Sequence, residues 1–273
     1  MKKNCFLLSV LMVLCVTSCS QRKASAGSTE LVVFAAASLT ETMEQIAGLY
    51  KKAAPNVKLT FNFDSSGTLK TQIQEGAECD VFISAGQRQM DQLDSTASAA
   101  VNAEGLDFAL QGSRINFLEN RVTLCVPKGN PAGIKSFADL ADKLAHNNIL
   151  FATGNGDVPV GQYTQRILKF FNLDEDALAK SGKITYGANV KEVTAQIAAS
   201  SVDCGVVYCT DAYSAGLEIA DYATVEMCGQ IIYPAAVMKS GKNPDAAAAF
   251  LEYLKTDEAL DVFEKAGFAA ARR

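Results

Sequence analysis

The sequence has few of the side chains on which catalytic and metal sites most often depend. Its 273 residues include a single histidine, His146, and no pair of cysteines separated by two residues. A zinc site draws on several cysteine or histidine ligands, so we expect no metal-ion site. No GxSxG or SxxK motif surrounds Ser38 or Ser66, and no GxxxxGK[ST] loop occurs. These absences argue against a serine hydrolase, against a nucleotide-binding enzyme and against catalysis in general.

Positive charge is also scarce. The chain has 25 Lys and Arg against 30 Asp and Glu, a formal net charge of −5, without long basic runs. A nucleic-acid partner is therefore not expected. The net charge also gives no long-range attraction for an anion, so an anionic ligand would have to be held by local geometry. No apolar run after Thr29 has the length of a membrane span.

The first residues have the pattern of an export signal. Lys2 and Lys3 precede an apolar run over residues 6–16, which is short for a membrane helix. Small residues then lead into Cys19, as in the lipobox of bacterial lipoproteins, and residues 20–29 have the polar composition of a tether. We expect lipidation at Cys19; ordinary secretion with cleavage elsewhere is the alternative. Two lipid chains would anchor the exported protein stably to a membrane.

Five cysteines follow Cys19. An odd number leaves at least one thiol unpaired within the chain. Free cysteines commonly behave as small buried apolar residues, and we take buried thiols as the default while pairing stays open. The five are Cys79, Cys125, Cys204, Cys209 and Cys228.

Short apolar runs alternate with helical patterns along the rest of the chain. Residues 31–34 are a buried-strand candidate, followed by apolar residues at helical spacing up to Tyr50. Such alternation predicts an α/β fold with mainly parallel sheets flanked by helices. No internal repeat is present, which argues against a purely structural or adhesive lipoprotein. We expect a signal peptide over residues 1–18, a lipid-anchored tether over 19–29, one lobe from 30–119 and 232–273, and a second lobe from 120–231.

Cap-like residues stand where four helices are expected to begin. Each alone indicates only a helix start. In an open α/β sheet, however, these turns lie at the carboxyl ends of the strands, where ligands bind. Helix starts carry unpaired N–H groups and partial positive charge, so several that converge can hold an anion without a lysine or arginine. The four starts are Ser38 with Glu41 in a capping-box spacing, the turn over residues 64–68, Pro159, and Asn189 with Glu192.

Several motifs, in this order, resemble the periplasmic molybdate-binding proteins of ABC transporters, a branch of the type II periplasmic-binding-protein fold. The resemblance runs through most of the chain after the tether. It is carried by Val33-Phe34-Ala35-Ala36-Ala37-Ser38-Leu39-Thr40, Ser65-Ser66-Gly67-Thr68-Leu69, Asp80-Val81-Phe82-Ile83-Ser84-Ala85, Val158-Pro159-Val160-Gly161-Gln162-Tyr163, Gly205-Val206-Val207-Tyr208-Cys209-Thr210-Asp211-Ala212, Tyr233-Pro234 and Gly267-Phe268.

This resemblance implies a two-lobed clamp that closes on molybdate, and on tungstate nearly as well. It implies an exported monomer, tethered to the membrane, that delivers the oxyanion to a permease and its ATPase without any cofactor. The implied ligands are the hydroxyl and amide groups of Ser38 and Ser66, the backbone N–H groups of Val160 and Val190, and the phenol of Tyr208.

Two departures from the family pattern bear on these assignments. Gly67 stands where a hydroxyl residue is expected beside Ser66. Asp64 and Asp157 lie near the expected mouth of the cleft, where an inward carboxylate would repel a dianion, so we expect them to face water or cap backbone groups. The main alternative is a related binding protein for another oxyanion, such as sulfate or phosphate.

Overall fold

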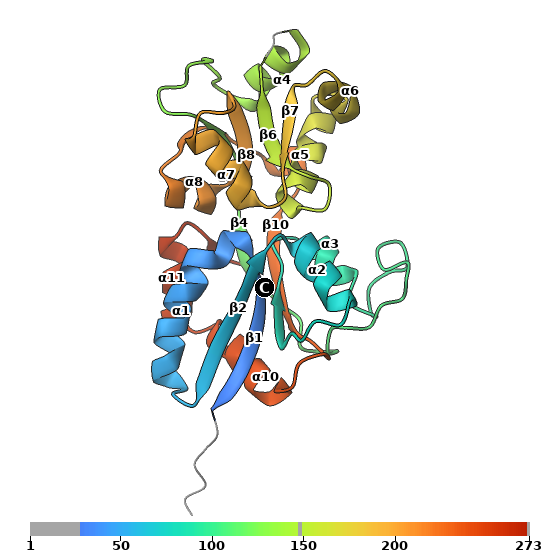
Figure 1. Ribbon diagram of the computed structural model, residues 1–273, viewed down its shortest axis with the longest axis vertical. Helices are drawn as coiled ribbons and strands as arrows, with labels where there is room; N and C mark the ends of the chain where they lie inside the picture. The colour runs from blue at the N-terminus through green and yellow to red at the C-terminus, as the bar shows by residue number, and fades with distance from the viewer. Residues whose placement is uncertain (1–27, 147–148, 272–273) are drawn as a thin grey trace, which may run out of the picture.

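The computed structural model describes residues 28–146 and 149–271, which form two lobes stacked along the long axis of the molecule (Figure 1). The signal peptide and the lipidated Cys19 predicted above lie outside the described residues. Within the described ranges, no helix combines the length and the apolar character needed to cross a membrane.

The first lobe is built on a six-stranded sheet with the strand order β11-β4-β10-β3-β1-β2. Helices pack along both faces of this sheet (Figure 1). The strands are β1 (Thr29–Ala36), β2 (Val57–Asp64), β3 (Val81–Ile83), β4 (Ile115–Asn120), β10 (Ile231–Val237) and β11 (Ala269–Ala270). The helices are the 3-10 turn η1 (Ala37–Leu39), α1 (Thr40–Ala53), α2 (Ser66–Gln74), α3 (Gln87–Asp91), α10 (Pro244–Tyr253) and α11 (Asp257–Lys265).

The second lobe has a five-stranded sheet with the order β7-β6-β8-β5-β9. Its strands are β5 (Val122–Val126), β6 (Phe151–Gly154), β7 (Ile184–Gly187), β8 (Cys204–Tyr208) and β9 (Glu218–Tyr222). Its helices are α4 (Phe137–His146), α5 (Pro159–Phe170), α6 (Glu175–Lys180), α7 (Val190–Ala198), α8 (Cys209–Ala215) and α9 (Val225–Cys228).

The two-lobed α/β fold is confirmed, but the sheets are mixed rather than mainly parallel. In the first lobe β1 is parallel to β2 and β3, whereas β10 is antiparallel to β3 and β4. In the second lobe β6 is parallel to β7 and β8, whereas β5 is antiparallel to β8 and β9. The antiparallel strands include those on which the chain passes between the lobes, so their direction follows from that passage rather than from a βαβ crossover.

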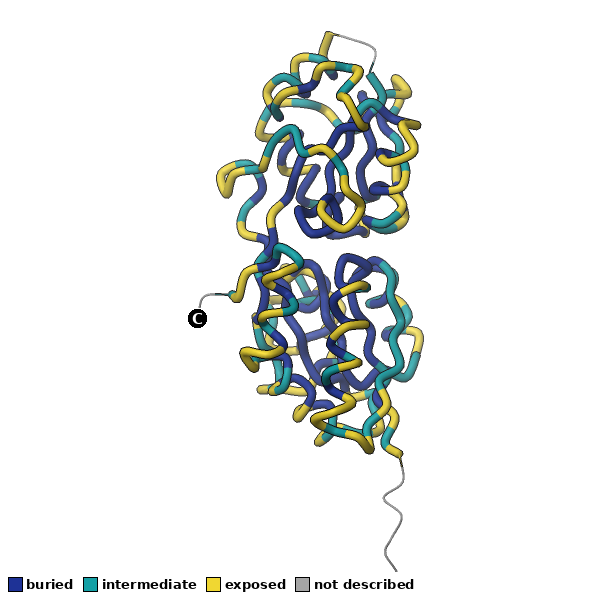
Figure 2. Tube along the Cα trace, turned by 90° about the vertical axis from the view of Figure 1, so that its left-hand side faces the viewer, coloured by how far each residue is buried: buried dark blue, intermediate teal, exposed yellow. Residues whose placement is uncertain are grey.

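The lobes are joined by two short connections at the waist of the molecule. Arg121 alone separates β4 of the first lobe from β5 of the second, and residues 229–230 lead from α9 back to β10. Figure 2 shows that the segments facing each other across this waist are buried in both lobes. The strand ends on either side therefore form the surfaces that meet between the lobes.

Helix α1 illustrates how the sequence directs the packing. Its buried residues are Thr42, Met43, Ile46 and Tyr50, which recur at helical spacing and face the sheet. Glu41 lies in the first turn and two lysines in the last, an order that the helix macrodipole favours.

All five cysteines of the described chain are unpaired and buried, in agreement with the default taken from the sequence. Burial raises the pKa of the Cys125 thiol to about 12 and that of Cys228 to about 11, so both stay protonated at neutral pH. His146 lies at the exposed end of α4, with a ring nitrogen 3.7 Å from a carboxylate oxygen of Asp142. Helix α4 lies at the end of the second lobe that is remote from the waist (Figure 1).

Candidate functional site

Ser38 lies at the carboxyl end of β1, inside the turn η1, and is almost fully buried. The capping box predicted from Ser38 and Glu41 is wrong. The residue before α1 is Leu39, which makes no side-chain cap. The hydroxyl of Ser38 is instead 2.9 Å from the phenol oxygen of Tyr233 on strand β10. Ser38 is therefore held by a tertiary contact and not by the helix that follows it.

The junction between β2 and α2 contains two adjacent serines, Ser65 and Ser66, whose hydroxyls make different hydrogen bonds. Ser65 caps α2, because its hydroxyl accepts the N–H of Thr68 at 3.1 Å. Ser66 is fully buried, and its hydroxyl oxygen accepts the N–H of Ala85 at 2.9 Å. A hydroxyl has one proton, and a backbone N–H can only donate. The proton of Ser66 is therefore left for a different acceptor.

In the second lobe, two helix starts face the first lobe. Pro159 occupies the first position of α5, as predicted, and Val160 is its second residue. Val190 is the first residue of α7, which Asn189 caps by accepting the N–H of Glu192 at 3.1 Å. The helix itself offers no acceptor to N–H groups in its first turn. Val160 and Val190 therefore present backbone donors toward the waist.

Tyr208 ends strand β8 and is buried, with its hydroxyl 3.4 Å from the backbone carbonyl of Ala85 in the other lobe. Burial raises the pKa of the Tyr208 phenol well above its ordinary value. The group thus stays protonated and available as a donor. A bond of 3.4 Å is long, so little is lost if the proton turns to a better acceptor.

A small cavity lies between the lobes where these elements meet. Four of the five predicted residues line it, namely Ser38, Ser66, Val190 and Tyr208. Val160 is not in its wall, although its neighbours in the same turn are. No lysine, arginine, aspartate or glutamate is among the lining residues, which are Ala36, Ala37, Ser38, Ser65, Ser66, Ala85, Val158, Pro159, Val190 and Tyr208.

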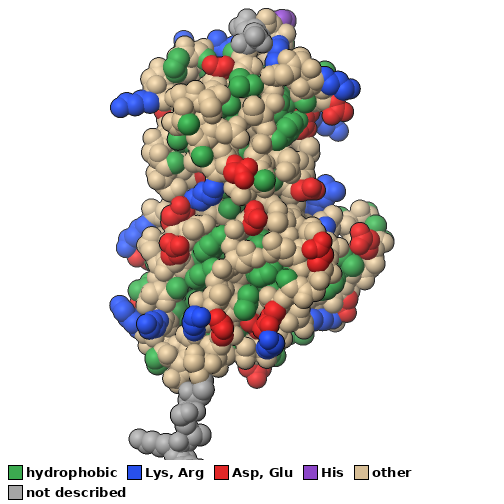
Figure 3. Space-filling view, in the orientation of Figure 1, with side chains coloured by type: hydrophobic (Ala, Val, Ile, Leu, Met, Phe, Trp, Pro, Cys, Tyr) green, Lys and Arg blue, Asp and Glu red, His purple; other side chains and the backbone are tan. Residues whose placement is uncertain are grey.

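The acidic residues near the mouth do not point into the cavity. Asp64 accepts the N–H of Ser65 at 2.7 Å and the side-chain amide of Asn189 at 3.3 Å, so it caps backbone as expected. Asp157 is exposed, also as expected. On the face shown in Figure 3, acidic and basic side chains are interspersed rather than gathered into one patch. The wall of the cavity therefore presents hydroxyl and amide groups rather than charged side chains.

A lysine beside the cavity is already paired with acidic side chains. Lys191, in the first turn of α7, places its ammonium 2.8 Å from Glu41 of the first lobe and 3.2 Å from the buried Asp211. Burial raises the pKa of the Asp211 carboxyl to about 6, although Lys191 opposes this shift. The Glu41–Lys191 pair bridges the two lobes beside the cavity.

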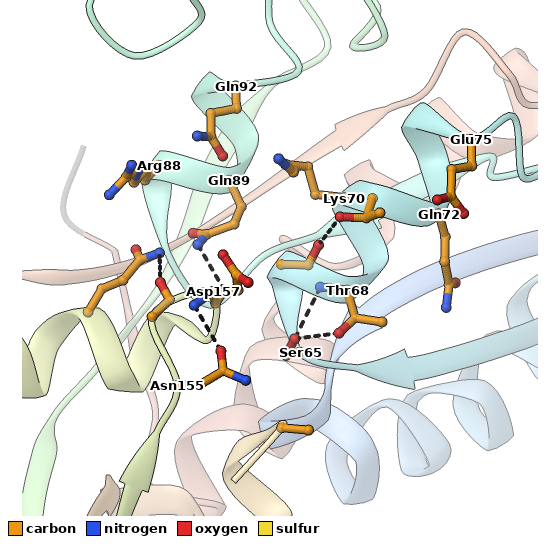
Figure 4. A pocket seen from close by; sticks show the side chains of 15 residues that line it. Ser65, Thr68, Lys70, Gln72, Glu75, Arg88, Gln89, Gln92, Asn155 and Asp157 are labelled. Carbon is orange, nitrogen blue, oxygen red and sulfur yellow. Dashed lines mark hydrogen bonds between the residues drawn. The ribbon is translucent and has the colours of Figure 1, made fainter. Parts of the chain in front are cut away.

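A larger groove opens beside the cavity, and Figure 4 shows it from close by. Side chains of both charge signs line it, including Lys70, Glu75 and Arg88, and none of the five predicted residues does. Gln89 of the first lobe spans it to donate to the backbone carbonyl of Asp157 at 3.4 Å. This groove is much larger than the small cavity.

Gly67 lies at a close contact between the two lobes. A Cβ atom on Gly67 would lie 2.2 Å from the carbonyl oxygen of Asp157, closer than real contacts allow. The residue that departs from the family pattern is thus the one that lets α2 meet the turn before α5. The need for glycine at this position arises from its contact with Asp157, 90 positions away, so it could not be predicted from the spacing of residues along the chain.

A family comparison gives the class of protein to which this fold and cavity belong. Residues 31–269 match the model of the bacterial extracellular solute-binding protein family, and the chain belongs to that family. Solute-binding proteins of this class are not an enzyme family.

Three relatives narrow the comparison. The chain is 33% identical, over 98% of both chains, to the Bacillus subtilis (strain 168) protein YvgL, whose name describes it provisionally as an ABC transporter substrate-binding lipoprotein. It is 32% identical to the Escherichia coli (strain K12) molybdate-binding protein ModA over 88% of each. The solved periplasmic molybdate-binding protein of Azotobacter vinelandii superposes with a TM-score of 0.73 at 25% identity, covering 89% of this chain and 100% of that one.

Proposed function

We propose that this protein captures molybdate, and tungstate almost equally, and delivers it to the permease and ATPase of an ABC importer. The observation that carries the proposal is the cavity between the lobes, which is lined by hydroxyl and helix-start donors and by no charged side chain. The names of the relatives support the same ligand.

The chemistry of the cavity fits a fully deprotonated dianion. Such an ion has only acceptor oxygens and needs only donors. Hydrogen bonds to a charged partner contribute about 1.5–3 kcal/mol each, so several of them offset desolvation and ordering. We propose that Ser38, Ser66, Val160, Val190 and Tyr208 supply the donors. Sulfate, with shorter bonds to oxygen, would span the two lobes less well.

We further propose that the protein acts by binding alone, without catalysis or a resident cofactor. It would work as an exported monomer tethered through lipid at Cys19, as the name of the Bacillus relative suggests. A binding protein for another oxyanion is the second candidate, favoured by the similarity of fold to a solved sulfate-binding protein of Mycobacterium tuberculosis H37Rv, at 17% identity and a TM-score of 0.69.

Calorimetric titration of the purified protein with molybdate, tungstate, sulfate and phosphate tests the proposal. Molybdate and tungstate should bind with comparable affinity, and excess sulfate should fail to compete. Ser38→Ala should weaken molybdate binding by about 1.5–3 kcal/mol. Effective competition by sulfate would favour the second candidate, a binding protein for another oxyanion. An unchanged molybdate affinity in a folded Ser38→Ala variant would show that Ser38 is not a ligand.

A further inference from the structure

A chain of buried hydrogen bonds runs from the hinge to the cavity. The side-chain amide nitrogen of Asn120, the last residue of β4, donates to the phenol oxygen of Tyr233 at 3.2 Å. The same phenol oxygen is 2.9 Å from the hydroxyl of Ser38. All three side chains are buried, and only Ser38 lines the cavity. The chain therefore ends on a group that can face a ligand.

The direction of each bond in this chain is fixed at its hinge end. The side-chain oxygen of Asn120 accepts the N–H of Arg121 at 2.8 Å, so its NH₂ group faces Tyr233. An amide NH₂ donates and cannot accept. The phenol proton of Tyr233 then has the hydroxyl oxygen of Ser38 as its acceptor, and a buried proton left without an acceptor is costly. Ser38 accepts from Tyr233, and its own proton is left for the cavity.

Ser66, a second serine of the cavity wall, is ordered in the same sense. The N–H of Ala85 donates to the hydroxyl oxygen of Ser66, which leaves the proton of Ser66 outward. Burial also raises the pKa of the Tyr233 phenol well above its ordinary value, so its proton is not lost at physiological pH. The hydroxyls of Ser38 and Ser66 are thereby presented to the cavity as donors, although a free hydroxyl could either donate or accept.

We propose that Asn120 and Tyr233 are positioning residues that hold Ser38 as a hydrogen-bond donor and so exclude oxyanions that carry a proton. The proposal rests on the proposed oxyanion-binding function. A protonated oxyanion needs an acceptor in the cavity, and the hydroxyls of Ser38 and Ser66 face it as donors. The selection acts through Ser38, since neither Asn120 nor Tyr233 lines the cavity.

Tyr233→Phe separates this role from simple packing. The ring of Tyr233 packs edge-on against Tyr208 and Phe268, with centroids 5.9 Å and 5.3 Å away, and phenylalanine keeps these contacts. Without the phenol, Ser38 is free to turn and accept a proton. Tyr163→Phe is the matched control, because it also removes a buried phenol, from a ring next to Tyr208 that is outside the chain of hydrogen bonds.

The test measures the dissociation constants of molybdate and of hydrogen arsenate, a protonated tetrahedral dianion, by direct and competitive calorimetric titration at mildly alkaline pH. In the wild type, arsenate should compete poorly. In Tyr233→Phe, the ratio of the arsenate to the molybdate dissociation constant should fall about tenfold or more. In Tyr163→Phe the ratio should not change. A purely structural role for Tyr233 would weaken both ligands alike and leave the ratio unchanged, which would overturn the proposal.

Asn120→Asp provides a second route if Tyr233→Phe does not fold. A carboxylate accepts where the amide donates, so in Asn120→Asp the phenol of Tyr233 would turn its proton toward the new carboxylate and accept from Ser38. The ratio should fall again, while the added negative charge weakens both dianions equally and cancels from it. A wild type that fails to bind molybdate would contradict the proposed function. Molybdate binding with an unchanged ratio in both variants would contradict only this inference.

Discussion

Closure of the two lobes depends on the absence of a side chain at Gly67. Alanine at this position would put a Cβ atom 2.2 Å from the carbonyl oxygen of Asp157, about 1.2 Å inside an ordinary contact of 3.4 Å. Both partners are constrained, because Gly67 is in the first turn of α2 and the clash is with backbone. The lobes must therefore stay apart by about an ångström at this edge in Gly67→Ala.

The expected cost to binding follows from this separation. A hydrogen bond near 2.9 Å that is stretched by an ångström exceeds the range in which such bonds stabilise a complex. Loss of one or two second-lobe donors, at about 1.5–3 kcal/mol each, should weaken molybdate binding by about 3 kcal/mol, or roughly a hundredfold. The ligand-free protein should melt near the wild-type temperature, because the open arrangement does not require the contact.

Calorimetric titration and a thermal melt of each variant measure both quantities. Gly48→Ala is the matched control. Gly48 is exposed in α1, and no atom lies within 4 Å of the place that a Cβ would take, so alanine should leave binding unchanged and stabilise the helix by up to about 1 kcal/mol. Wild-type affinity in Gly67→Ala would refute the reasoning, because the contact between α2 and the turn at Asp157 would then play no part in ligand capture.

Three further predictions concern single residues around the cavity. Ser66→Ala should lower the molybdate affinity, since it removes a donor. It should also lower the melting temperature, because the buried N–H of Ala85 is left unpaired at a cost of about 1–3 kcal/mol. A titration that shows weaker binding, together with a melt at the wild-type temperature, would contradict the expected loss of stability. The pKa of Asp211 is raised from 3.8 to about 6, so between these values the folded protein binds more protons than the unfolded chain, and its stability should rise as the pH falls. In denaturant titrations, the free energy of unfolding of the wild type should increase by about 1 kcal/mol relative to that of Asp211→Asn when the pH falls from 7 to 5. If the free energies of unfolding of the two proteins changed in parallel with pH, protonation of Asp211 would not contribute to stability. Glu41→Gln breaks a partly exposed pair between the lobes, so molybdate should bind a few-fold more weakly at low salt and with wild-type affinity near 1 M salt; a salt-independent defect in the titrations would contradict the electrostatic explanation.

Features determined within a few residues could be read from the sequence. Pro159 at the first position of α5 and Asn189 as the cap of α7 depend only on their own turns, and both predictions are confirmed. The two-lobed α/β fold follows from the alternation of apolar runs and helical patterns. Strand direction does not, because a buried run has the same composition whether the chain enters it from one end or the other.

Features that depend on distant partners could not be read in this way. Ser38 was predicted to be a helix cap from its spacing to Glu41. Its actual partner, Tyr233, lies 195 positions away and therefore could not be identified from the local sequence. Asn120 gave no signal, since it carries an ordinary amide at the end of a strand. The five proposed ligands came from the resemblance to a family rather than from spacing. The structure brings four of them to one cavity, while their ligand roles stay predictions.

The single residue between β4 and β5 has a mechanical consequence. A rigid body that turns about a narrow joint moves each of its atoms in proportion to the distance from the axis. A small rotation at Arg121 would shift the atoms near the cavity slightly and those around α4 and α6, at the far end of the second lobe in Figure 1, by much more. The arrival of one ion would thus be amplified into a displacement of the outer surface, on a scale that a large membrane complex could sense without touching the ion.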